Sequence, residues 1–224
     1  MIRASQTLSY IAAVAASVTL GGCAHEVRFH AEYLPEEPPQ YVAEGKLLIL
    51  MPEEQRFFVY EGPPSSRTGD YTTLIVPIGN IVQEIARHVF GECFAYGVEV
   101  TDSLVGRDDF VLAIEGDMQQ FIYSYTKVID AGFDGQSANA WIVPEVDLAF
   151  AVKGYNRAGE TVLDKIYDSG VKAGEAYLTT SKPVERINRV LHTTVHDLML
   201  DLVADVRPLL MEECELTELA TTRQ

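Results

Sequence analysis

Apolar residues follow two different periods along the chain, and the changes between them mark the predicted elements. Runs that are continuously apolar, or that alternate with polar residues, predict strands; they lie at 47–51, 56–60, 71–77, 98–100, 109–116, 120–128, 141–154 and 160–167. Apolar residues spaced three or four positions apart predict two amphipathic helices, at 78–89 and 183–206. We also expect Asn80 and Gln83 to cap the first helix and residues 156–159 to form a hairpin turn.

The order of these elements predicts an α+β fold. We expect a mostly antiparallel sheet with the two amphipathic helices packed on one of its faces. The pattern of strands and helices predicts a single domain over residues 46–210. The acidic segment that follows predicts a solvated C-terminal tail over 211–224.

The first 22 residues have the organisation of a secretory signal peptide. Arg3 precedes an apolar run at 11–20, which is shorter than the roughly 20 residues of a membrane-spanning helix. The run ends in Leu-Gly-Gly-Cys at 20–23, which resembles the bacterial lipobox, where a large aliphatic and two small residues precede a cysteine. We expect the Cys23 thiol to be acylated and Cys23 to become the new N-terminus. The alternative is an ordinary secretory signal that ends near a buried cysteine.

The resemblance to a lipobox implies a location as well as an anchor. Several acyl chains together hold a lipoprotein stably on a membrane. In such lipoproteins an aspartate after the cysteine favours the inner membrane, whereas Ala24 and His25 follow Cys23 here. The resemblance therefore implies the periplasmic face of the outer membrane.

Prolines dominate the segment between the lipobox and the first predicted strand. Pro35, Pro38 and Pro39 stand among acidic residues in 24–44, and proline holds a chain extended without building a core. The segment therefore favours a tether over residues 23–45. The alternation of Val27, Phe29 and Tyr33 leaves a short strand as the alternative.

Acidic side chains outnumber basic ones by 33 to 17. The 22 residues of the signal peptide hold one arginine and no acid, so the mature chain keeps 16 basic and 33 acidic residues and a net charge of −17. Such a surface repels nucleic acid and anionic lipid head groups. The composition therefore argues against nucleic-acid binding.

The sequence lacks the common motifs of serine hydrolases and of phosphate-binding enzymes. It has no Gly-x-Ser-x-Gly nucleophile elbow and no phosphate-binding Gly-x-x-x-x-Gly-Lys-Ser/Thr loop. His192 and His196 have a spacing that suits zinc, but Thr193 stands where a metalloprotease places its glutamate. We therefore expect no enzyme activity, cofactor or metal site, and two histidines half-exposed beside an apolar stripe.

Aromatic residues alternate along the predicted strand at 120–128. Phe121, Tyr123 and Tyr125 share one face of it. Such a pattern is typical of one side of a packed sheet. Together with Trp141 and Tyr155, it also leaves open a groove for a lipid or glycan.

Segment 146–201 resembles the C-terminal half of the YajG-type outer-membrane lipoproteins. It holds an alternating strand, a polar hairpin, a second strand, a stretch of small and aromatic residues and an amphipathic helix, in that order. The insertion at 131–145 and the proline-rich segment depart from that pattern. The resemblance implies a non-catalytic envelope protein, related to lipoproteins that assist envelope transporters and secretion machines, and it carries over only Cys23, as the lipidated residue.

Two functions are compatible with these features. The first is an accessory or structural protein that acts by protein–protein interaction with envelope proteins, alone or as a homo-oligomer. The second is a lipoprotein that binds a small apolar or glycan ligand in a pocket between helices and sheet. A large exposed apolar patch would favour the first, and a closed apolar cavity of several hundred cubic ångströms the second.

Two cysteines remain once Cys23 is acylated. Cys93 follows the first predicted helix and Cys214 follows the second. In an oxidising compartment we expect them to form a disulfide, which needs Cα atoms within about 7 Å. The alternative is a buried Cys93 and a free Cys214.

Replacing the lipobox cysteine tests the anchor directly. Cys23→Ser should abolish acylation and cleavage after Gly22, because a hydroxyl does not replace the thiol in lipid transfer. Metabolic labelling with a radioactive fatty acid measures this, and label that persists in Cys23→Ser would contradict the expectation. Cys93→Ser serves as the control and should retain the label.

Overall fold

The computed structural model describes residues 23–35, 43–69, 72–131, 138–178 and 183–221. Its helices are η1 (Ala31–Tyr33), α2 (Glu53–Arg56), α3 (Ile78–Gly91) and α4 (Pro183–Thr221). The first five strands are β1 (Cys23–Glu26), β2 (Leu47–Leu50), β3 (Tyr60–Gly62), β4 (Thr72–Val76) and β5 (Val98–Thr101). The other four are β6 (Leu112–Ala131), β7 (Ala138–Asn156), β8 (Thr161–Ala173) and β9 (Tyr177–Leu178).

The strands form a large and a small sheet. The large sheet has the order β5-β2-β6-β7-β8, with β9 paired to β7, and the small one has the order β1-β4-β3. β6, β7 and β8 pair antiparallel, whereas β2 runs parallel to both β5 and β6 and β1 runs parallel to β4. The α+β class is confirmed, and the sheets are mixed rather than purely antiparallel. The reason is that the chain crosses over through α3 between β2 and β5, and such a crossover returns a strand in the parallel direction.

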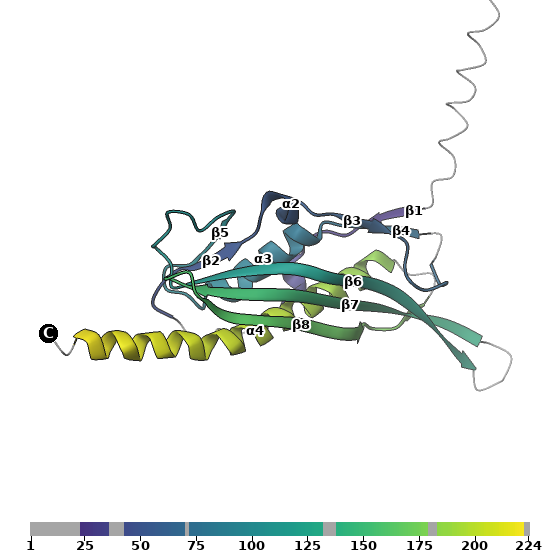
Figure 1. Cartoon of the computed structure of the whole chain (residues 1–224). Helices are drawn as coiled ribbons and strands as arrows, with labels where there is room; N and C mark the ends of the chain where they lie inside the picture. Colours follow the sequence, from purple (N-terminus) through teal and green to yellow (C-terminus); the bar gives the residue numbers. More distant parts are fainter. Residues whose placement is uncertain (1–22, 36–42, 70–71, 132–137, 179–182, 222–224) are drawn as a thin grey trace, which may run out of the picture.

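Helices α3 and α4 lie on the same side of the large sheet, as the sequence predicts (Figure 1). The stripe of α4 is buried along its length, at Ile187, Leu191, Val195, Leu198 and Leu202. The alternating residues of β7 are buried against it, at Val146, Leu148, Phe150 and Val152. Alternation in the strand and a period of three to four in the helix therefore bring two apolar faces together.

Three predicted strands, at 56–60, 109–116 and 120–128, differ from the observed ones. The segments 109–116 and 120–128 belong largely to one strand, β6, because a register shift between Met118 and Gln120 absorbs the polar residues between them. The predicted strand at 56–60 is wrong over most of its length. The chain instead makes the short helix α2 after Pro52, and β3 begins only at Tyr60.

The local turn predictions have opposite outcomes. The cap by Asn80 and Gln83 is wrong, because α3 begins at Ile78, directly after Pro77, and Pro77 makes no side-chain cap bond. The predicted hairpin at 156–159 is confirmed. The Gly159 N–H donates to the Asn156 carbonyl at 2.9 Å, and Gly159 has a φ of 80°, which suits glycine.

The segment after the lipobox packs on the body, so the tether does not describe residues 23–35. A short strand does form, but earlier than the alternation of Val27, Phe29 and Tyr33 suggests: β1 ends at Glu26 and pairs with β4, Val27 is fully buried beyond it, and Tyr33 lies in η1. Phe29 stacks on the His192 ring, with 5.5 Å between the ring centroids. Apolar burial against α4 explains this docking, which the prolines obscured. Residues 36–42 lie outside the described chain.

At the other end, α4 continues to Thr221. It is longer than the predicted helix at 183–206, and the predicted tail is therefore helical as far as Thr221.

Cys93 is a buried free thiol that donates to the Val89 carbonyl at 3.2 Å. The side chain of Cys214 lies outside the description, so the disulfide with Cys93 stays a prediction.

The two histidines of α4 are buried, which corrects the expectation that they sit half-exposed. His192 is fully buried and His196 is 3% exposed. The His192 Nδ1 lies 2.9 Å from the Asn188 carbonyl, and its Nε2 accepts a hydrogen bond from the His30 backbone N–H at 3.0 Å. These two contacts require a neutral ring with its proton on Nδ1. Burial lowers the pKa of His192 to about 4.

Protonation of His192 should therefore weaken the fold as the pH falls. The unfolded chain takes up this proton near its ordinary pKa of 6.5, and the folded chain only near about 4. Above both values the ring is neutral in either state and contributes no pH dependence. Between them the unfolded state binds more protons, so the free energy of unfolding should fall by up to about 3 kcal/mol as the pH decreases through this window.

Urea denaturation at a series of pH values measures this dependence. His192→Phe should lower the stability at neutral pH, because the His30 N–H loses its acceptor, and should flatten the dependence between pH values of about 4 and about 6.5. His88→Asn, at an exposed position of α3, is the matched control and should keep the wild-type slope. An unchanged slope in His192→Phe would contradict the assignment.

Candidate functional site

A cavity of about 400 Å³ lies between the helices and the large sheet. It extends from α2 and the start of α3 to the middle of α4, and the inner face of β2, β6, β7 and β8 closes its other side. The lining is mostly apolar and includes Ile78, Val82, Phe90, Ile114, Phe150, Val152, Leu198, Met199 and Leu202. A cavity of this size falls in the range of small-molecule binding sites.

Small side chains on opposing elements keep this space open. Gly116 lies on β6 between Ile114 and Met118, and a Cβ atom added to it would meet nothing within 4 Å. Ala86 stands on the facing side of α3. Larger residues at these two positions would occupy part of the volume, so the small side chains of Gly116 and Ala86 leave it unfilled.

Few polar groups reach the cavity. Gln55 of α2 and Gln83 of α3 line it, and in the described part of the chain their Oε1 atoms are buried without a hydrogen-bond partner. Tyr167 also lines it, but its hydroxyl donates to Asp205 at 2.7 Å, and burial together with this carboxylate raises its pKa. The charged residues in the lining are Glu54 and Asp117, both exposed. The site is thus a mostly apolar chamber, and the two amide oxygens, which have almost no accessible surface, do not open onto it.

Exposed apolar residues stand where α2 leads out of the cavity. Phe58 lines the cavity and is 41% exposed. Its neighbours Phe57 and Val59 are 68% and 47% exposed. The sequence predicts a buried strand at 56–60 because these residues are apolar. In the structure Phe57, Phe58 and Val59 instead face solvent beside the opening of the cavity.

The aromatic residues of β6 do not line this cavity. Tyr123 and Tyr125 are buried, with their ring centroids 5.9 Å apart. Tyr60 of β3 packs on Phe121 with 4.7 Å between centroids, and the Tyr123 hydroxyl donates to the Gly62 carbonyl. These contacts confirm the packed-sheet interpretation for the aromatics of β6.

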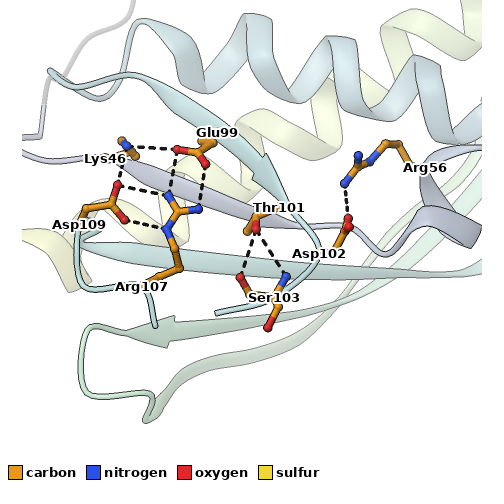
Figure 2. A network of polar contacts seen from close by, with 8 residues as sticks. All are labelled: Lys46, Arg56, Glu99, Thr101, Asp102, Ser103, Arg107 and Asp109. Carbon is orange, nitrogen blue, oxygen red and sulfur yellow. Dashed lines mark hydrogen bonds and ion pairs between the residues drawn. The ribbon is translucent and has the colours of Figure 1, made fainter. Parts of the chain in front are cut away.

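A separate cluster of charged side chains lies at the β5 edge of the large sheet (Figure 2). Arg107 makes hydrogen bonds to both Glu99 and Asp109, and Lys46 reaches the same two carboxylates. Hydrogen bonds from Arg107 and then Lys46 hold the pKa of Asp109, and likewise of Glu99, below its ordinary value. All four groups are thus ionised and mutually paired, which suits them to fastening the loop after β5 to the sheet rather than to proton transfer.

A separate ion pair joins the loop after β5 to α2. Arg56, at the end of α2, pairs with Asp102 in the same loop, and Figure 2 shows this contact beside the cluster. The partners in these pairs are separated by up to 63 positions in the chain. Sequence patterns register only local neighbours, and no signal in them indicated the cluster.

Two further features are absent from the residues that the structure describes. No group of three or more His, Cys, Asp or Glu side chains there is arranged to hold a metal ion, and His192 instead receives the N-terminal segment. No helix in the described ranges is long and apolar enough to cross a membrane.

Comparisons with known proteins give weak likenesses. No family model and no curated protein matches the chain. A Xanthomonas campestris protein of family DUF330 aligns over 87% of this chain and 98% of its own, at 12% identity and a TM-score of 0.49. A neuraminyllactose-binding hemagglutinin homolog from Helicobacter pylori aligns over 87% and 98%, at 10% identity and 0.44. A minor lipoprotein from Acinetobacter baumannii aligns over 72% and 89%, at 8% identity and 0.31.

None of these structures is similar enough to indicate a function for this chain. The resemblance to YajG-type lipoproteins is not confirmed by them either. The function has to be argued from the residues of this chain and from the cavity.

Helices α2 and α3 pack closely at Gly79, where the backbone of α2 lies against this glycine. A Cβ added there would lie 2.1 Å from the Gln55 carbonyl oxygen and 2.5 Å from that of Arg56. Gly79→Ala should therefore separate the two helices and lower the free energy of unfolding by about 1–3 kcal/mol. Gly91→Ala, in the last turn of α3 with nothing within 4 Å, should be neutral or stabilising by up to about 1 kcal/mol. Chemical denaturation measures both, and equal stabilities would contradict the close approach.

Proposed function

We propose that this protein is a lipid-anchored protein of the bacterial cell envelope that binds a small apolar ligand between its helices and its large sheet. The observation that carries this proposal is the cavity of about 400 Å³ with its mostly apolar lining. Protein interiors are packed to nearly crystalline density, and voids larger than a water molecule are few. A space of this size with a mostly apolar lining supports a role in binding.

The N-terminal sequence supports the anchor. The lipobox resemblance places the acyl chains on Cys23, and β1 begins at that same residue. The body then stands directly at the membrane surface, with no spacer between lipid and sheet. Ala24 and His25 after the cysteine favour the periplasmic face of the outer membrane.

The lining favours an apolar ligand over a glycan. A sugar presents hydroxyl groups on all sides and needs a hydrogen-bond partner for each one that is buried. Gln55, Gln83 and Tyr167 are the uncharged residues of the lining with polar side chains, and the Tyr167 hydroxyl is already bonded. The proposed role is binding, without catalysis, cofactor or nucleic acid.

A separate observation favours a role in protein–protein interaction with envelope proteins, including a second copy of this chain. β8 is the last strand of the large sheet and carries Ile166 and Val171, which are 64% and 66% exposed. An edge strand offers unpaired backbone groups to another strand. An accessory role in an assembly is therefore the second candidate function, and it is compatible with ligand binding.

Binding of the uncharged fluorophore N-phenyl-1-naphthylamine to the mature chain tests the cavity. We expect saturation at one molecule per chain in the wild type. Val82→Trp places a bulky ring into the cavity and should weaken binding at least tenfold. Val171→Trp adds the same ring on β8 and should bind as the wild type does. Thermal midpoints confirm that both variants fold, and equal binding by the two variants would contradict the proposal.

A further inference from the structure

The side of the large sheet that is turned away from α3 and α4 is a second surface with a definite pattern. In Figure 1 the strands β6, β7 and β8 lie in front of both helices, and no described helix or strand stands over them there. We call their outward positions the outer face, over 115–126 of β6, 143–153 of β7 and 164–173 of β8. We propose that the outer face binds a basic amphipathic helix of another envelope protein, an inference that rests on the second candidate function.

The strand register places the outward side chains in rows across the three strands. The central rows, each running from β6 through β7 to β8, are Ile122, Asp147 and Val171; Gln120, Ala149 and Asp168; and Asp117, Ala151 and Ile166. Ile122, Ile166 and Val171 are 41%, 64% and 66% exposed. The solvated face of an antiparallel sheet is normally polar. Apolar side chains that gather on such a face mark an interaction surface.

Acidic side chains surround these apolar residues. The carboxylates at outward positions are those of Glu115, Asp117, Glu145, Asp147, Asp164 and Asp168. Among the described residues of the outer face, Lys153 is the basic one, and it stands between Glu115 and Asp164. A partner whose apolar side chains are flanked by lysines or arginines complements this pattern. A second copy docked by the same face would instead bring like charges together, which is costly.

The dimensions of the outer face suit a helix. Val143 and Ala151 of β7 are eight positions apart, which corresponds to about 26 Å along a strand. A helix of about 18 residues has nearly the same length. Laid along β7, it would approach closely over the short side chains of Ala149 and Ala151 and contact Ile166 at its side. Basic residues beside its apolar stripe would then reach Asp117.

Fluorescence anisotropy with two labelled helical peptides of about 18 residues tests this inference on the mature chain. Both peptides carry the same amphipathic stripe of leucines, and their polar positions are all lysine in one and all glutamine in the other. The lysine peptide should bind at least tenfold more tightly than the glutamine peptide. Equal binding of the two peptides, or binding of neither, would overturn the inference. Saturable binding of N-phenyl-1-naphthylamine would in that case leave the proposed ligand binding standing.

Variants of apolar residues separate the outer face from other exposed apolar positions. Ile166→Ser together with Val171→Ser leaves the charge unchanged and should weaken binding of the lysine peptide at least tenfold. Phe57→Ser together with Val105→Ser is the matched control, because these residues are 68% and 91% exposed outside the outer face, and it should bind as the wild type does. Equal weakening in both pairs would contradict the assignment of the surface. Thermal midpoints confirm that the variants fold.

Variants of acidic residues separate the outer face from the net negative charge of the whole chain. Asp117→Asn together with Glu145→Gln should weaken the lysine peptide several-fold. Glu61→Gln together with Glu92→Gln removes the same charge at exposed positions outside the outer face and should leave binding unchanged. Equal weakening in the two pairs would show attraction by net charge alone and would overturn the inference.

Sedimentation of the mature chain without peptide tests a second copy as the occupant. Wild type and the pair Ile166→Ser with Val171→Ser should sediment alike, because the acidic outer face does not pair with itself. Self-association of the wild type that this pair of substitutions abolishes would overturn the inference. The second candidate function would then stand, with a second copy as the partner.

Discussion

The packing of α4 against the inner face of the large sheet is the interaction on which the other parts of the structure depend. The N-terminal half of the helix buries Ile187 and Leu191, and there Asn188 and His192 hold the backbone of the segment after Cys23. Further along, Leu198 and Leu202 form one wall of the cavity. Beyond them, Asp205 bonds Lys165 and Tyr167 of β8. One apolar stripe therefore supports both the segment after Cys23 and the cavity.

Cys23 and the cavity are connected through the small sheet. β1 begins at Cys23 and pairs with β4, and β4 leads through Pro77 directly into α3, which forms a wall of the cavity. The ion pair of Arg56 and Asp102 fastens α2 to the loop after β5, which also carries Arg107 and Asp109 of the ion cluster. The elements around the opening are thus fixed to both sheets, which suits a preformed site that needs little rearrangement to accept a ligand.

The open space has a cost in stability, and the sequence shows how it is maintained. A void removes dispersion contacts from the side chains around it, and lost core volume destabilises proteins markedly. Gly116 and Ala86 leave room where larger residues would pack. Gln55 and Gln83 add buried oxygens that lack partners in the described chain. A ligand that fills the space would restore the lost dispersion contacts, which connects the energetics of the fold to the proposed role.

The sequence by itself determined the elements whose burial follows a local period. The stripe of α4 and the alternation of β7 both indicated their buried faces correctly, because a period of three to four or of two reports which side of an element avoids water. The lipobox resemblance likewise depends on four adjacent residues. Only the tertiary structure showed that the helices and the large sheet leave a cavity between them. Gly116 of β6 and Ala86 of α3 both line it, and they belong to elements that are separate in the chain. It also decided that the segment after Cys23 docks on His192, since a buried partner 162 positions away outweighs the local preference of the prolines for an extended tether.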